Sequence, residues 1–252
     1  MIDILVIAFG DTDRNHLLNY NFDKKFKVKT WLFDFWSKRE RKSLRKLLSL
    51  KKMDGMILGG NQRIEMPTKM SMEKGYTSNK LRNYKDVEEN KGYIWDELFQ
   101  IISYCSNMPI LGICMGSHLL DIYYGSEVPT DLGKKYTRKR EETRLNDSVL
   151  FKDMGKLGYF EYNHIQIIKR HSYNAKVIAW NKTRESGYKF NSKHFGLNFH
   201  IIHSYPDAKK IIKNFINLCE MSKHQQTGFY KSGQYLTLIL LLIALYSRTF
   251  HI

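Results

Sequence analysis

The stretch PILGICMGSHLLDIYYG (residues 109–125) contains the pattern that is most informative about the fold of this chain. Pro109 precedes a short apolar run, Cys114 stands between Gly112 and Gly116, and apolar residues then recur at helical spacing. A buried strand, a tight turn and an amphipathic helix produce these patterns in this order. We therefore expect a strand–turn–helix unit that carries a cysteine at its turn.

The segments before this unit have the same alternating character. IDILVIAFG (2–10), KVKTWLFDF (27–35) and MDGMILGG (53–60) are predicted as buried strands, with amphipathic helices at 38–50 and 93–105. Continuous apolar strands that alternate with helices are typical of parallel sheets covered on both faces. The sequence therefore predicts an α/β, flavodoxin-like fold, a doubly wound and mostly parallel sheet with helices on both faces.

The second half of the chain contains shorter apolar runs. Four of them are predicted as additional strands: SVLF (148–151), IQIIK (165–169), KVIAW (176–180) and FGLNFHII (195–202). PDAKKIIKNFINLCEM (206–221) is predicted as the closing amphipathic helix, with Pro206 at its start. These elements place one domain at residues 1–221.

Residues 222–252 are predicted to form a C-terminal tail. Within it, YLTLILLLIALY (235–246) is apolar apart from Thr237. A membrane-spanning helix needs about 20 such residues, and this run is shorter. We expect the run to pack on the domain or on a partner subunit, and membrane contact of the tail is the less favoured alternative.

The composition narrows the class of partner. Lys and Arg number 41 against 25 Asp and Glu, which gives a net charge of +16. Such a charge suits anionic partners, but no nucleic-acid-binding motif accompanies it, so nucleic-acid binding is not expected. The three cysteines are scattered and form no CxxC pair. This usage favours a reducing compartment, and we expect a cytoplasmic protein.

Cys114 is placed for nucleophilic chemistry. A sharp strand-to-helix turn presents its side chain, and the neighbouring glycines let backbone segments approach closely. The N-terminus of the following helix favours the thiolate over the thiol. The amide of Met115 can form half of an oxyanion hole. The alternative is a small buried cysteine in a glycine-rich turn.

A cysteine nucleophile needs a histidine that the fold brings close. His200 ends an apolar run and precedes the last helix, which suits a site at the carboxyl edge of the sheet. LGGN ends another strand there, and the amide of Gly60 can complete the oxyanion hole. His194, His200 and His203 would also permit a metal, but no cysteine or carboxylate adjoins them at ligand spacing. We therefore expect no metal and no other cofactor.

Four segments in this order resemble the class I (triad-type) glutamine amidotransferases, a family that includes the glutaminase domains of GMP synthase and anthranilate synthase. PILGICMGSHLL is similar to the family's P-[IV]-L-G-[IV]-C-x-G-x-Q-x-[LM], and DGMILGGN to its oxyanion strand D-G-[IL]-[IV]-L-[ST]-G-G-P. EYNHIQII (161–168) resembles the S-H-G-D segment of the glutamine pocket, and HFGLNFHIIHSYPD is similar to G-[VT]-Q-F-H-P-E. The matches span about residues 2–220.

The resemblance implies a role for each matching residue. Cys114 would be the nucleophile and His200 the general acid and base, with the amides of Gly60 and Met115 at the oxyanion. The substrate would be bound by Gly59, His118, Asn163 and His164. Cys114 would then attack glutamine or another γ-glutamyl amide, form a thioester and release ammonia. No synthetase segment follows in the sequence, so use of the ammonia would require a separate synthetase subunit as partner. Otherwise the protein would be a free-standing hydrolase of γ-glutamyl compounds.

The departures from the family pattern leave a second hypothesis open. The family's catalytic Glu, two residues after the histidine, falls on Ile202, and the Gln after the elbow is His118. Glu161, Asp207 or another carboxylate can substitute only if the fold brings it close, and sequence does not place one. The alternative function is therefore a catalytically impaired, amidotransferase-like binding or regulatory module.

Overall fold

The computed structural model describes residues 1–9, 27–60, 93–127, 130–131, 139–162, 166–182, 184–201 and 206–225. The helices are α2 (Lys38–Leu50), α5 (Tyr93–Tyr104), α6 (Met115–Tyr123), the 3₁₀ turn η1 (Val149–Phe151) and a C-terminal helix at 206–225. The strands are β1 (Ile2–Ala8), β2 (Val28–Asp34), β3 (Gly55–Leu58), β4 (Ile110–Ile113), β5 (Thr130–Asp131), β6 (Lys139–Leu145), β7 (Leu157–Tyr162), β8 (Gln166–Ile167), β9 (Lys176–Asn181), β10 (Glu185–Lys189) and β11 (His194–Leu197).

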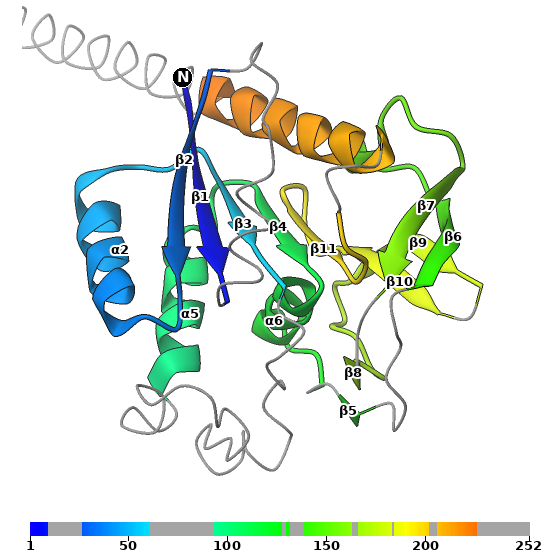
Figure 1. Ribbon diagram of the computed structural model, residues 1–252, viewed down its shortest axis with the longest axis horizontal. Coiled ribbons are helices and arrows are strands. Elements are labelled where there is room, and N and C mark those ends of the chain that lie inside the picture. Colours follow the sequence, from blue (N-terminus) through cyan, green and yellow to red (C-terminus); the bar gives the residue numbers. More distant parts are fainter. Residues whose placement is uncertain are drawn as a thin grey trace, which may run out of the picture.

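One sheet organises the described part of the chain. Its nine strands follow the order β2-β1-β3-β4-β11-β10-β9-β6-β7, and β5 pairs with β8 separately. The first five strands of this order are parallel. From β11 to β7 every pairing is antiparallel. The sheet therefore has a parallel half and an antiparallel half, and β11 joins them (Figure 1).

Helices cover both faces of the parallel half. Alternate residues of β1 point to opposite faces, as the geometry of a strand requires. Ile4 and Val6 lie in one buried cluster with Ile211 of the C-terminal helix. Leu5 and Ile7 lie in a second cluster that takes its helical members from α2, α5 and α6. The predicted α/β, flavodoxin-like fold with helices on both faces is confirmed (Figure 1).

Most predicted elements appear close to their expected bounds. The helix at 38–50 is α2, with Ser37 as its N-cap accepting a hydrogen bond from the Glu40 amide at 3.3 Å. The closing helix continues to residue 225, beyond its predicted end at 221. In the described ranges no helix is long and apolar enough to cross a membrane. The apolar run at 235–246 lies outside those ranges.

The antiparallel half contains the main errors of the sequence prediction. SVLF (148–151) is not a strand, because its last three residues form η1, with Ser148 as the N-cap. β6 was missed because its sequence, KREETRL, is highly charged. Only alternate residues of such a strand need to be apolar. In β6, Thr143 and Leu145 are buried, whereas Arg144 between them is exposed.

Candidate active site

Cys114 forms a sharp turn between β4 and α6. Its φ of 52° and ψ of −111° lie in a region that residues with a β-carbon rarely adopt. Its amide donates to the Leu197 carbonyl of β11 at 2.7 Å, and its own carbonyl accepts from the Ser117 amide at 3.0 Å. The strained residue is thus held by a strand on one side and a helix on the other. Strain of this kind is typical of functional sites.

Two glycines make this turn possible. A β-carbon on Gly116 would lie 2.7 Å from the Gly59 carbonyl oxygen and closer still to that of Leu58. A β-carbon on Gly112 would lie 2.5 Å from the carbonyl oxygen of Gly116. Both contacts are with backbone, which cannot move aside as a flexible side chain can. The spacing of the glycines around the cysteine therefore reflects close packing of the turn against the end of β3.

Gly59 and Gly60 follow β3 and lie beside the turn. A β-carbon on Gly60 would be 2.6 Å from the Cys114 β-carbon and 3.4 Å from its Sγ. The Gly59 amide donates to the Ile7 carbonyl at 2.9 Å and is thus occupied by the fold. The structure brings Gly60 to the cysteine, while its role at an oxyanion, like the substrate contact expected of Gly59, remains a prediction.

His200 lies beyond the same edge of the sheet as Cys114. β11 runs parallel to β4 with Leu197 beside Ile113, so the two residues follow neighbouring strand ends. The His200 amide donates to the Glu161 carbonyl at 2.8 Å, which anchors the histidine segment to the end of β7. Its Nε2 is shielded from solvent. The fold thus brings Cys114 and His200, which are predicted to act together, to the same edge of the sheet.

His118 lies on the first turn of α6 and is only 4% exposed. Burial lowers its pKa to about 4, with nearby Asp121 acting in the opposite direction and His171 in the same one. The ring is therefore neutral at physiological pH. Its Nδ1 is buried and has no hydrogen-bond partner among the residues that the structure describes. Its expected contact with substrate remains a prediction.

A polar cluster beside His118 was not predicted from the sequence. His171 Nδ1 pairs with the Asp121 carboxylate, and His171 Nε2 lies 2.8 Å from the Tyr188 hydroxyl. The Ser172 amide also donates to Asp121, at 3.1 Å. The available signal was the spacing of His118 and Asp121, because polar residues three apart on an apolar helix share one face. This cluster supports the first turns of α6.

His194, one of the three histidines considered for a metal, is held by the fold through both ring nitrogens. His194 Nδ1 is 2.5 Å from the Tyr124 hydroxyl, and His194 Nε2 is 3.1 Å from the Met108 carbonyl. Both ring nitrogens are therefore engaged by the fold. Within the described ranges no three His, Cys, Asp or Glu residues are arranged to hold a metal ion. His203 lies outside those ranges.

The other two cysteines differ from Cys114. Burial raises the pKa of the Cys105 thiol to about 12, and it raises that of Cys219 well above its usual range. All three cysteines are buried members of the two core clusters, but Cys105 and Cys219 lack the positive φ of Cys114. These two are structural thiols. Asn163, His164 and Ile202, which the resemblance placed at the site, lie outside the described residues.

The site geometry is that of an α/β protein with a cysteine on a nucleophile elbow and a histidine at the same edge of the sheet. The family model for Glutamine amidotransferase class-I matches residues 83–218, which include both Cys114 and His200. This match covers more than half of the chain. The chain belongs to the glutamine amidotransferase class-I family.

Individual relatives agree with this assignment. The glutamine-hydrolyzing GMP synthase of Clostridium tetani is 27% identical over 137 residues, covering 53% of this chain and 26% of that protein. A glutamine-hydrolyzing GMP synthase subunit of Picrophilus torridus is 29% identical over 116 residues, covering 45% of this chain and 61% of that protein. The chain thus spans between about a quarter and three fifths of these relatives.

A solved structure supports the fold independently. A candidate GMP synthase subunit from Thermoplasma acidophilum superposes with a TM-score of 0.64 at 17% identity. The superposition covers 90% of this chain and 98% of that chain. At this identity the likeness concerns the fold alone.

Proposed function

We propose that this chain hydrolyses the side-chain amide of glutamine through a thioester on Cys114. The observation that carries the proposal is the strained Cys114 at the N-terminus of α6, with His200 at the same edge of the sheet. A cysteine in this position is ionised readily, because the helix N-terminus stabilises the thiolate. Membership of the amidotransferase family supplies the substrate class.

The reaction has two covalent steps. The Cys114 thiolate attacks the γ-carbonyl carbon, an S–C bond forms, and the C–N bond breaks as His200 passes its proton to the departing ammonia. The amides of Gly60 and Met115 stabilise the oxyanion that forms in between. Water, deprotonated by His200, then attacks the thioester. Glutamate leaves, and the thiolate and imidazolium are restored.

The ammonia released at this site needs an acceptor. The relatives that match this chain include proteins named as single subunits of GMP synthase. We propose by analogy that a separate synthetase subunit consumes the ammonia in the cytoplasm. The three free cysteines support a reducing compartment.

Ammonia release by the purified protein tests the proposal. Glutamine should give ammonia and glutamate in equal amounts, and Cys114→Ala should lower this activity by about 10⁵-fold or more. Asparagine, one methylene shorter, is the matched substrate control, and Cys219→Ala is the matched cysteine control. Turnover that survives in Cys114→Ala would refute the thioester mechanism.

The second candidate function is a binding or regulatory module without turnover. The observation that favours it is Ile202 at the position of the family's catalytic Glu. Such a module would bind glutamine without releasing ammonia. Saturable glutamine binding by calorimetry, together with no ammonia release from the wild-type protein, would support the module and reject the enzyme.

A further inference from the structure

We propose that Glu161 orients His200 and takes over the role that the family's Glu performs from the position of Ile202. The proposal rests on the proposed function, because an oriented imidazole matters only if Cys114 acts as a nucleophile. Glu161 is a positioning residue in this account, since it acts on the thiol through His200. Its carboxylate comes from the end of β7, far from His200 in sequence.

The first observation is a backbone pairing between the two residues. Glu161 and His200 form an antiparallel bridge, and the His200 amide donates to the Glu161 carbonyl at 2.8 Å. Partners in such a bridge project their side chains to the same face, with β-carbons about 4.5–5.5 Å apart. This separation places a glutamate carboxylate within reach of a histidine ring. The bridge therefore sets the two side chains next to each other.

Packing on the opposite face supports this direction for both side chains. Phe199, next to His200, stacks on Phe160, with ring centroids 4.2 Å apart, and lies 5.9 Å from the ring of Tyr162. All three rings are fully buried in one core cluster. Burial alternates along both segments, because half-buried Glu161 lies between buried Phe160 and Tyr162, and half-buried His200 lies between buried Phe199 and Ile201. Both side chains therefore lie away from these three rings.

A carboxylate on the cross-strand partner of a histidine can reach the same face of the ring as a carboxylate two residues further along the chain. In an extended segment, a residue two positions after the histidine shares its face. The cross-strand partner of the histidine shares that face too, and it is at least as near. A carboxylate can thus approach the same imidazole from the neighbouring strand instead of from the same strand. The loss of the acid at position 202 is compatible with a working histidine for this reason.

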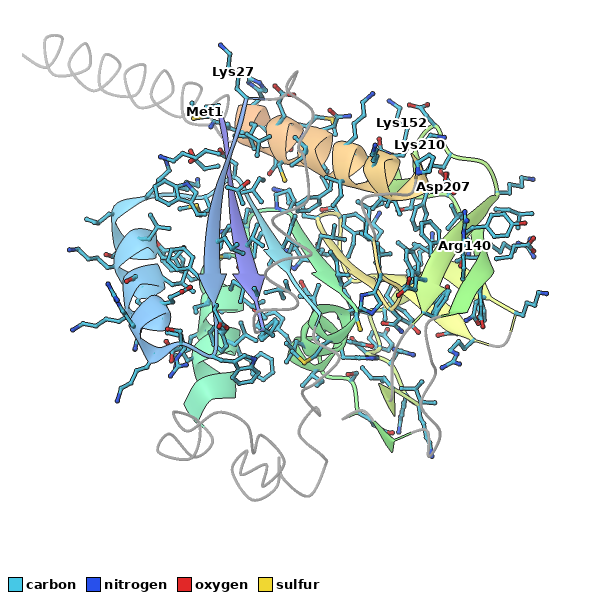
Figure 2. The ribbon with its side chains drawn as sticks, viewed as in Figure 1. Met1, Lys27, Arg140, Lys152, Asp207 and Lys210 are labelled. Atoms are coloured by element: carbon cyan, nitrogen blue, oxygen red, sulfur yellow. The ribbon has the colours of Figure 1, made fainter. Side chains whose placement is uncertain are left out.

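Other charged groups near Glu161 define the competing explanation. Arg140 of β6 is the register partner of Glu161 on its other side, and its guanidinium lies 5.6 Å from the ring of Tyr159. Glu142 on the same strand accepts from the Tyr159 hydroxyl at 3.1 Å. Figure 2 labels Arg140 in this antiparallel half and Asp207 at the start of the C-terminal helix. Glu161 therefore has a basic side chain as its register partner on each side, Arg140 on one and His200 on the other.

Carboxylate support of His200 makes a specific chemical prediction. A negative charge beside the ring stabilises the imidazolium, which in turn stabilises the Cys114 thiolate. Glu161→Gln keeps the shape and the backbone bridge but removes the charge. The pH range in which thiolate and imidazolium coexist should then become narrower. Thiol ionisation should require higher pH, and loss of the imidazolium should occur at lower pH.

The test measures the rate at which iodoacetamide alkylates Cys114 across pH 5 to 10, with the site of labelling read by mass spectrometry. We compare the wild type with Glu161→Gln, with Glu161→Asp, and with Glu142→Gln as the matched control on the next strand. Alkylation needs no glutamine turnover, so its outcome is independent of the proposed function. Thermal unfolding of each variant reports whether the fold is intact.

We expect the alkylation profile to shift by about one pH unit or more in Glu161→Gln, to be restored in part by Glu161→Asp, and to stay unchanged in Glu142→Gln. In glutamine hydrolysis, kcat should fall about tenfold or more with little change in KM, less than the ~10⁴-fold loss known for a serine triad. Adding Ile202→Glu to Glu161→Gln should recover activity. An alkylation profile of Glu161→Gln identical to that of the wild type would overturn the proposal. The Glu161 carboxylate would then pair with Arg140 and not with His200.

Two further outcomes separate this proposal from the proposed function. A shifted alkylation profile without any glutamine hydrolysis in the wild type would keep Glu161 as the positioning residue and reject the enzyme. Glutamine hydrolysis that Glu161→Gln leaves unaltered would keep the enzyme and reject Glu161. If Glu161→Gln proves unfolded, the profile of Glu161→Asp decides, because the shorter carboxylate must move it measurably while Glu142→Gln does not.

Discussion

The two halves of the sheet contribute to the site in different ways. The parallel half supplies the elbow with Cys114 at its turn. A β-carbon on Gly112 or Gly116, the glycines on either side of Cys114, would collide with backbone atoms. His200 follows β11, the strand that joins the two halves, and one bridge to Glu161 at the end of β7 anchors it to the antiparallel half. The cysteine and glycines of the elbow keep the pattern of the family, although His118 replaces its Gln, whereas the segment around the histidine lacks the family's Glu.

This difference reflects how each half constrains its residues. The residues two positions before and after the nucleophile must be glycine at this tight turn, because an added β-carbon would meet backbone atoms. A carboxylate that supports a histidine can come from any segment that reaches the ring. The nucleophile side therefore tolerates little change, while the base side can be rebuilt from a neighbouring strand.

His200→Ala should produce the largest effect on catalysis. Loss of the general acid and base should lower kcat for glutamine by about 10³-fold, because ammonia then leaves without a proton donor. Steady-state ammonia release measures this change. His224→Ala, an exposed histidine on the C-terminal helix, is the control and should behave as the wild type. Equal activity in both variants would remove His200 from the mechanism.

Gly116→Ala should damage the elbow and the fold together. The added methyl group would press on the carbonyls of Leu58 and Gly59 and should cost about 3 kcal/mol of unfolding free energy. Chemical denaturation measures this loss. Gly155→Ala is the matched control, because its β-carbon would come no nearer than 3.8 Å to its neighbours. If Gly116→Ala proves as stable as Gly155→Ala, the elbow is not tightly packed.

His118→Gln should change the pH dependence of stability. The folded pKa of His118 is about 4 against an unfolded value of about 6.5, because burial disfavours the charged ring. The contribution of the neutral His118 ring to the free energy of unfolding is present above pH 6.5 and is lost as the pH falls towards 4. By pH 5 this loss is about 2 kcal/mol. Gln cannot titrate, so the variant should lose less stability between pH 7 and 5.

Unfolding curves at several pH values measure this difference between the variant and the wild type. His194, whose pKa burial also lowers to about 4, provides further acid sensitivity in both proteins. Asp121 and His171 are the charged or titratable neighbours that act on His118. Identical pH dependence in the two proteins would show that His118 is already protonated or solvated in the folded state.

The sequence predicted the parallel half well because its strands β1, β3 and β4 are buried along their whole length. The apolar runs of β1, β3 and β4 have no other stable position than the interior of a doubly wound sheet. It predicted the antiparallel half poorly, because strands such as KREETRL bury only alternate residues. The apolar SVLF was wrongly predicted as a strand, since Ser148 caps a 3₁₀ turn instead.

The candidate site likewise has a part that the sequence predicts and a part that it does not. Cys114 was predicted from local spacing, because a strained turn leaves a glycine signature within five residues. The pairing of Glu161 with His200 could not be predicted, since it depends on how the end of β7 meets the segment after β11. The support of α6 by Asp121 and His171 depends equally on a contact between distant segments. Such contacts are set by topology and not by local pattern.

Covalent labelling with a glutamine analogue tests whether Cys114 is the nucleophile of a glutamine-binding site. An analogue that carries an electrophilic ketone in place of the side-chain amide should add one equivalent to the protein, and peptide mapping should find it on Cys114. Cys105 and Cys219 are internal controls, because burial keeps their thiols protonated. We predict a single adduct on Cys114 that free glutamine prevents. Labelling that spares Cys114, or that glutamine does not compete, would contradict the account.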